Sequence, residues 1–298
     1  VALNGARILA VGSRGDITAL AGPSTRRIDA QGATVMPGMV EAHLHLFAGA
    51  FGLRLLQLDH IRGLDPVREA IRASSAATPG NGLLLCKGAS YSLFGDGVAT
   101  TRQMLDQVLP DRPLAVVAAD HHTAWANTPA LRAAGLLQGC AVPPGNEVVM
   151  GADGTATGEL REFEAYKLVL DLHESGGRES LGLVGEEPKV VTAEQREGDL
   201  AIMLEGLRYC ASFGFTSLHN MDGNWYQLHL LRTLEERGQL LCRTEVPFHL
   251  TPVKPVSSLA EASEMHETFR SDRLRSGRVK MFMDGVIDSG TAAMIEDY

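Results

Sequence analysis

Residues 35–46 read VMPGMVEAHLHL, and this stretch decides the fold. Pro37-Gly38 breaks the chain just before an apolar run, which predicts a buried strand that ends in polar residues. Polar residues at the carboxyl end of a buried strand are typical of the active site of a (β/α) barrel. Alternate strand residues share a face, so His43 and His45 point the same way and can bind one metal ion. A His-x-His pair alone is a weak signal, and the alternative is two polar residues at a strand end.

The chain after this strand predicts a parallel α/β architecture. Apolar runs indicate strands, and helical periodicity indicates helices between them. The strands are expected at 214–220, 241–250 and 278–284, and the helices at 193–213, 224–239 and 259–271. Strand–helix–strand alternation is the pattern of parallel sheets. Residues 47–200 are mixed in character and are interpreted as a long α/β insertion after the first strand, covering the site.

Inside this insertion the interpretation is less regular. Helices are expected at 65–77, 101–109 and 130–137, and short strands at 83–88 and 114–120. The stretches CAVPPGNE and GADGTATGE are expected to be loops, and residues 173–189 an exposed or mobile segment, because they are polar and rich in glycine.

The first 35 residues predict a small β structure. Asn4-Gly5 stands between apolar stretches, which is a hairpin signal. Residues 25–30 and 34–38 are expected to be strands on either side of a turn at Gly32. Strands this short cannot bury a core alone and need a partner sheet.

Composition excludes several classes of protein. The chain has 298 residues, a formal charge of −9 and no cluster of lysines and arginines, so we expect no nucleic-acid partner. No apolar run reaches the roughly 20 residues that span a bilayer, and no signal peptide is evident, so we expect a cytoplasmic protein without a membrane partner. A homodimer is left open. The scattered cysteines are interpreted as buried free thiols: Cys86, Cys140, Cys210 and Cys242.

Five stretches in order resemble one protein family. The run PGMVEAHLHL is similar to the PG(L/F)(I/V)DxHxH signature of the amidohydrolase superfamily. Four more stretches resemble its family 3 branch, which includes N-substituted formamide deformylases: DHHTAWANTPAL (120–131), GTATGELRE (154–162), GFTSLHNMDG (214–223) and VKMFMDGVIDSGTAAM (279–294). The resemblance implies a (β/α)8 TIM-barrel metal-dependent hydrolase with a small β-sandwich domain. Residues 1–35 would be part of the β-sandwich, and residues 36–298 roughly the first half of the barrel with the insertion.

The resemblance also implies a metal centre. In the superfamily the two histidines of the first strand bind a divalent metal, most often zinc, in sites of one or two ions. Lys280 matches a fourth-strand lysine that is carboxylated and bridges two metals, and it would be both a ligand and a catalytic group. Its position in an apolar strand is costly unless the charge is paired. The alternative is a buried stem whose ammonium reaches solvent.

Other candidates belong to the substrate pocket. His122 in DHHTAWANTPAL matches a family position that faces the substrate, while its neighbour His121 is expected to be exposed. Asp284 is expected to bind substrate or, equally, to cap a turn. His219 ends the strand 214–220 and is a catalytic candidate, and His249 has the same type of position; a hydrogen-bonded core histidine is the alternative for both. Asn127 or Thr128 is expected to cap a helix.

The expected activity is hydrolysis of a C–N bond in a small-molecule amide, formamide or cyclic amide by a metal-activated water. The family's later ligands, two histidines and a general-base aspartate near the last strand, have no counterpart among the 298 residues. We therefore expect a truncated form or part of a longer polypeptide that does not turn over substrate alone. The alternative is a degenerate, non-catalytic homologue. A nucleotide-binding protein is disfavoured because no glycine-rich phosphate motif occurs.

Overall fold

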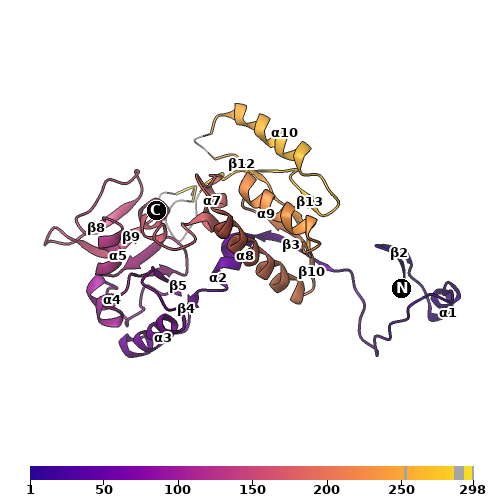
Figure 1. Ribbon diagram of the computed structural model, residues 1–298, viewed down its shortest axis with the longest axis horizontal. Helices are drawn as coiled ribbons and strands as arrows, with labels where there is room; N and C mark the ends of the chain where they lie inside the picture. Colours follow the sequence, from indigo (N-terminus) through magenta and orange to yellow (C-terminus); the bar gives the residue numbers. More distant parts are fainter. Residues whose placement is uncertain (252–253, 285–291, 297–298) are drawn as a thin grey trace. The chain divides into compact units, whose positions relative to one another are not determined.

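The computed structural model describes residues 1–251, 254–284 and 292–296. It divides into two compact units, Val1–Pro37 and Gly38–Tyr298, and each is described by itself (Figure 1). No helix in the described residues is long and apolar enough to cross a bilayer. The cysteines are all free, but only Cys86 and Cys242 are buried, while Cys140 is exposed and Cys210 intermediate.

The first unit holds one hairpin and one short helix. Strands β1 (Ala2–Asn4) and β2 (Arg7–Ala10) pair antiparallel, and Gly5 between them has a φ of 58°, as the Asn-Gly signal predicted. Helix α1 (Arg14–Ala19) follows. The prediction of strands at 25–30 and 34–38 is wrong, because these residues do not pair with any strand. Their apolar side chains, such as Ile28 and Val35, are exposed, so no buried face fixes a strand there.

The second unit begins with a parallel sheet. Its strands are β3 (Met39–Leu44), β10 (Phe215–Asn220), β11 (Arg243–Glu245) and β13 (Leu274–Arg275), in the order β13-β11-β10-β3. A parallel pair, β12 (Phe248–His249) and β14 (Val279–Lys280), follows β11 and β13 along the chain. The expected strand 241–250 is therefore broken, and Pro247, which lacks an N–H for the ladder, lies at the break.

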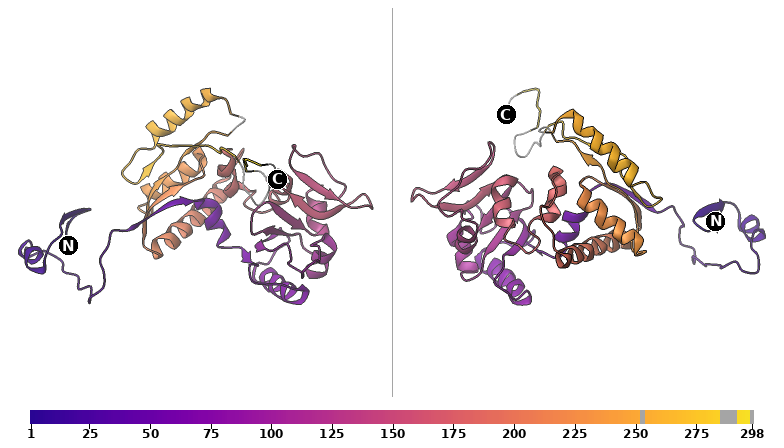
Figure 2. Two further views of the ribbon diagram at one scale, coloured as in Figure 1. Left: turned by 180° about the vertical axis from the view of Figure 1, so that it is seen from behind. Right: turned by 45° about the horizontal axis from the view of Figure 1, so that its top comes forward.

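Helices connect these strands as the periodicity predicted. They are α8 (Ala193–Ser212), α9 (Trp225–Glu236) and α10 (Leu259–Thr268), with a 3-10 turn η1 (Val256–Ser258) before α10. A further helix that was not predicted, α2 (Leu46–Gly52), follows β3. Thr192 caps α8 by accepting a hydrogen bond from the backbone of Gln195. Helix α8 packs on α2 and α9, as Figures 1 and 2 show. Gly206 allows this close packing, since a Cβ there would lie 2.5 Å from the Cβ of Ala50.

A second, six-stranded mixed sheet lies between α2 and α8 in the sequence. Its order is β4-β5-β6-β7-β9-β8, parallel from β4 to β6 and antiparallel beyond. The strands are β4 (Leu56–Gln57), β5 (Leu84–Ala89), β6 (Leu114–Ala118), β7 (Thr123–Ala126), β8 (Glu147–Met150) and β9 (Ala156–Arg161). Its helices are α3 (Leu64–Ala77), α4 (Arg102–Val108), α5 (Thr128–Ala133), α6 (Phe163–Leu170) and α7 (Arg178–Val184).

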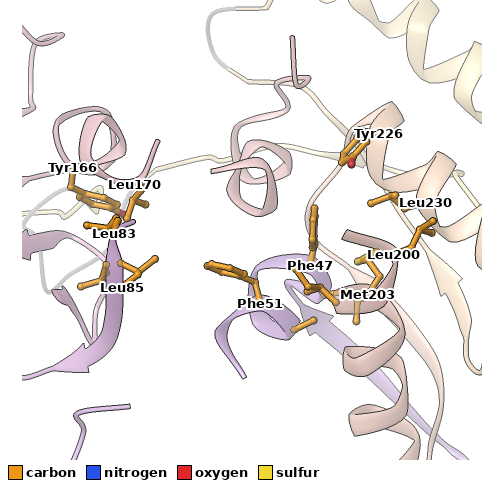
Figure 3. Close-up of a cluster of buried hydrophobic side chains, with 14 of the residues drawn as sticks. Phe47, Phe51, Leu83, Leu85, Tyr166, Leu170, Leu200, Met203, Tyr226 and Leu230 are labelled. Atoms are coloured by element: carbon orange, nitrogen blue, oxygen red, sulfur yellow. The ribbon is translucent and has the colours of Figure 1, made fainter. Parts of the chain in front are cut away.

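Apolar cores cover both faces of this sheet. Leu84 and Cys86 of β5 pack toward α3 and α4, while Leu83 and Leu85 belong to a larger core that continues through α2 and α8. Figure 3 shows the larger core, with Leu83 beside Tyr166 and Leu170 and with Phe51 projecting from α2. Burial on both faces explains why the sequence here is continuously apolar instead of alternating.

Two expectations about the insertion are wrong. Residues 140–146 have no helix or strand, as expected, and β8 begins at Glu147, but the expected loop 151–159 contains the first four residues of β9. The strand β9 buries the small or apolar residues Ala156, Gly158 and Leu160, a pattern with little hydrophobic contrast. The segment 173–189, expected to be exposed, contains α7, whose Arg178 and Glu179 are buried. Specific partners, and not composition, fix this helix in place.

Candidate active site

Polar residues lie at or near the carboxyl ends of the parallel strands. His43 lies in β3, His45 follows it directly, and His219, His249 and Lys280 lie in β10, β12 and β14. Carboxyl ends of parallel strands meet at one edge of a sheet, which is where α/β proteins bind ligands. These positions belong to strands that lie far apart in the chain.

His43 and His45 form the centre of this group. Their ring centroids are 5.6 Å apart and the rings stand nearly edge to face, at 75°. The Nδ1 of His45 donates a hydrogen bond to Oδ1 of Asp222, a carboxylate that is fully buried just after β10. The Oε1 of Glu41 accepts a hydrogen bond of 3.1 Å from the backbone N–H of His43. The Nε2 of His45 is therefore left to face a ligand.

The contact of His45 with Asp222 was not predicted from the sequence. The second oxygen of Asp222, Oδ2, finds no hydrogen-bond partner in the described part of the chain. Neighbouring Asn220 is also buried; it accepts from the backbone N–H of Leu46 at 2.8 Å and donates to the carbonyl of Asp222 at 3.0 Å. Asn220 thus ties the end of β10 to the start of α2. The signal for Asp222 was its place two residues beyond a strand end in GFTSLHNMDG.

A divalent ion fits this pair of histidines in part. Imidazole nitrogens are good ligands for zinc and similar ions. A ligating histidine usually donates its other ring N–H to a carboxylate, as His45 does to Asp222. Across the ranges that the structure describes, no group of three or more His, Cys, Asp and Glu side chains stands close enough to hold a metal. The chain therefore supplies two histidine donors here, and any further ligands would come from other groups.

Lys280 and His249 lie side by side on paired strands. They are register partners between β12 and β14. The ammonium of Lys280 lies 5.1 Å from the centroid of the Phe282 ring, and that ring lies 5.1 Å from the ring of His249. His249 is buried, which lowers its pKa, and its Nδ1 lies 3.4 Å from the carbonyl of Gly182. No contact between Lys280 and the His43–His45 pair occurs among the described side chains.

The other sequence candidates have local partners. Guanidinium nitrogens of Arg278 lie 3.0 and 3.2 Å from the two ring nitrogens of His219, and a neutral imidazole can accept from only one of them. His122 pairs through Nδ1 with Glu162 at 3.0 Å. Asp284 accepts a 3.0 Å hydrogen bond from the backbone of Ala293. The structure does not bring these three together with the histidine pair.

His45 also lines a cavity of about 260 Å³ between α2, the second sheet, α6 and α7. Its walls are mainly apolar, and the large residues in Figure 3 include Phe51 on one side and Leu85, Tyr166 and Leu170 on the other. The polar residues of the lining are His45, Lys87, His121, Tyr166, Glu179 and Ser180. A cavity that is apolar with a few polar groups is the usual form of a small-molecule site.

Three polar residues of the cavity were not predicted. Burial lowers the pKa of Lys87, although the charge of Asp59 opposes this, and burial raises the pKa of Glu179. His121 is exposed by area, as expected, yet it lines the cavity, and desolvation and then the Lys87 charge lower its pKa. Perturbed pKa values in a cavity are typical of functional sites.

Comparison with known proteins identifies the family of the chain. The sequence profile of the amidohydrolase family matches residues 26–298. The chain is 26% identical to the putative amidohydrolase YtcJ of Bacillus subtilis, over 93% of this chain and 48% of that protein. It is 30% identical to an N-substituted formamide deformylase of Arthrobacter pascens, over 56% of this chain and 31% of that protein. The chain thus spans about half the length of YtcJ.

Solved structures give the same result for the fold. An uncharacterized metal-dependent hydrolase from Pyrococcus horikoshii OT3 superposes with a TM-score of 0.56 at 20% identity, covering 86% of this chain and 44% of that one. At this identity the likeness concerns the fold alone. The mixed α/β architecture of the second unit is therefore one that metal-dependent hydrolases use.

Proposed function

Because the chain belongs to the amidohydrolase family, in its family 3 branch, we propose that it forms part of a metal-dependent enzyme that hydrolyses a C–N bond of an amide, formamide or cyclic amide. The observation that carries this proposal is the pairing of His45 with buried Asp222 at the rim of a mainly apolar cavity. In the same proposal the parallel strands β3, β10, β11–β12 and β13–β14 are the first four of a (β/α)8 barrel. The formamide deformylase relative supports the bond type.

In this proposal His43 and His45 hold the metal, with Lys280 as a third candidate. When bound, a divalent ion, most plausibly Zn²⁺, lowers the pKa of water and polarises a carbonyl. The chain's own residues do the rest. Asp222 fixes the tautomer and the orientation of His45, so that Nε2 faces outward. The apolar cavity wall orients the substrate and excludes water, which strengthens electrostatic contacts at the site.

His43→Asn and His45→Asn variants of the full protein test this function. Each change removes one imidazole donor while it keeps a polar side chain of similar length. We expect each variant to lose most of its bound metal, measured by mass spectrometry of the metal content, and to lose hydrolysis of N-substituted formamides by at least about a hundred-fold, because a metal-activated water supplies several kcal/mol of the barrier reduction.

His229→Asn is a suitable control, since His229 lies in α9 against Trp225 and Phe269 and does not line the cavity. It should keep both metal and activity. Normal metal content in both His43→Asn and His45→Asn variants would contradict the proposal, as would a native protein without bound metal. A native protein without bound metal would instead favour a degenerate homologue that keeps the fold and lacks the catalytic activity.

A further inference from the structure

Lys87 places an ammonium group in a mainly apolar cavity. Lys87 lies in β5, a strand otherwise made of apolar and small residues, and it is half-buried. Among the described residues, no carboxylate lies within the 4.0 Å of an ion pair with it, although the charge of Asp59 is near enough to raise its pKa. A half-buried ammonium of this kind is costly unless a ligand pairs with it.

The helix opposite makes room for this ammonium. A Cβ added to Gly52 in α2 would lie 2.0 Å from Nζ of Lys87, so a larger residue there would push the ammonium away from its present position. Gly49, one turn earlier in the same helix, also lines the cavity, but a Cβ there would meet nothing within 4 Å. The space beside Gly52 is therefore specific to Lys87.

The lining of the same cavity contains two more polar groups, His121 and Glu179. His121 has a φ of 63°, a left-handed conformation that is rare for a residue with a side chain. Tyr166 also lines the cavity. Its hydroxyl donates a 2.8 Å hydrogen bond to the backbone carbonyl of His121 and helps to hold His121 in this conformation. Glu179 is buried, and its Oε2 has no partner in the described part of the chain. Backbone strain of the kind seen at His121 is retained where the surrounding structure imposes it, often at ligand sites.

We propose that this cavity binds the carboxylate-bearing, apolar half of the substrate, with the carboxylate on Lys87 and the apolar body against Phe51, Leu85 and Leu170. The inference rests on the proposed function, because it places the scissile amide toward His45, which lines the same cavity. The raised pKa of Glu179 keeps that group neutral over a wider pH range, so it can donate a hydrogen bond without repelling the anion. The substrate class is then an N-substituted amide that is apolar and anionic.

Binding of two probes of nearly equal shape tests the inference. Phenylacetate carries the carboxylate, and phenylacetamide replaces it with a neutral amide. We expect the full protein to bind phenylacetate more tightly in calorimetric titration. Lys87→Met should weaken the affinity for phenylacetate by about ten-fold or more, as expected for the loss of a hydrogen bond to a charged group. It should change the affinity for phenylacetamide by less than about two-fold. Lys189→Met, at an exposed lysine outside the cavity, is the control.

Gly52→Ala gives a second variant that retains the lysine. The new Cβ would shift the ammonium, so phenylacetate binding should again weaken. Gly198→Ala, at a glycine of α8 that is outside the cavity and whose Cβ would meet nothing within 4 Å, should bind phenylacetate normally. Equal weakening of both probes by Lys87→Met, or normal binding of phenylacetate by Gly52→Ala, would overturn the inference, as would a native protein that binds neither. The same titration with His45→Asn separates this result from the proposed function, because loss of metal and activity with retained phenylacetate binding would leave the cavity assignment intact.

Discussion

At the scale of single residues, the contact between His45 and Asp222 decides what the histidine pair can do. The strand alternation places both imidazoles on one face, but it does not fix the ring nitrogen that faces outward. The buried carboxylate does this by accepting from Nδ1. A carboxylate in this position also makes the imidazole a better donor to a metal.

Asp222→Asn should therefore weaken metal binding by about ten- to a hundred-fold, because removal of an outer carboxylate typically has this effect. The measurement is a competition titration of the full protein against a chelator of known affinity. Asp171→Asn, which alters an exposed carboxylate paired with Lys167, should leave the affinity unchanged. An Asp222→Asn affinity within two-fold of the native value would show that Asp222 does not support the site.

At the scale of elements, helix α7 is held in place by a buried ion pair. The guanidinium of Arg178 donates to both carboxylate oxygens of Asp199 in α8, at 2.7 and 2.9 Å, and both side chains are almost fully buried. The hydroxyl of Tyr226 donates to the same carboxylate at 2.5 Å. Since α7 carries Glu179 of the cavity, these contacts position one wall of the cavity.

Arg178→Met should destabilise the protein by about 3–5 kcal/mol, since it leaves the buried Asp199 carboxylate without its counter-ion. Urea unfolding, followed by circular dichroism, measures this change. Combining Arg178→Met with Asp199→Leu should recover much of the lost stability, because neither buried charge of the pair then remains. Arg237→Met breaks an exposed ion pair between the end of α9 and Glu197 of α8, and it should have little effect. A small effect of Arg178→Met alone would contradict the role assigned to this pair.

At the scale of the whole molecule, buried thiols in different parts of the fold predict a loss of stability in alkali. Burial raises the pKa of Cys86 to about 12 and that of Cys242 to about 11, from an ordinary value of 9.0. Above pH 9 the unfolded chain loses these protons while the folded chain keeps them. The unfolded state therefore binds fewer protons, and the free energy of unfolding falls as the pH rises from 9 toward 11–12.

The urea midpoint should accordingly decline between pH 9 and pH 11. Cys86→Val and Cys242→Val should each make this decline shallower, whatever they do to stability at pH 7. Cys140→Val, at an exposed thiol, should leave the slope unchanged. A slope that is the same in all four proteins would show that other groups control the alkaline transition.

The sequence by itself determined the family, the parallel strands and the histidine pair. Short-range patterns carry these features: the alternation around His43 and His45, the apolar face of α8, and the Asn127 cap, whose side chain accepts from Ala130 as expected. Lys87 has the same signal as Lys280, a lysine in an apolar strand, but no family motif surrounds it. The roles of Lys280, His122, His219 and Asp284 remain predictions.

Only the tertiary structure decided which of these groups meet. Asp222 reaches His45 across 177 positions in the sequence, and Arg178 fixes a helix that composition indicated to be exposed. The cavity joins α2, β5, β6, α6 and α7, which no local pattern links. The physical reason is that periodicity and capping act over a few residues, whereas burial and the pairing of charges depend on neighbours that the folded chain brings together.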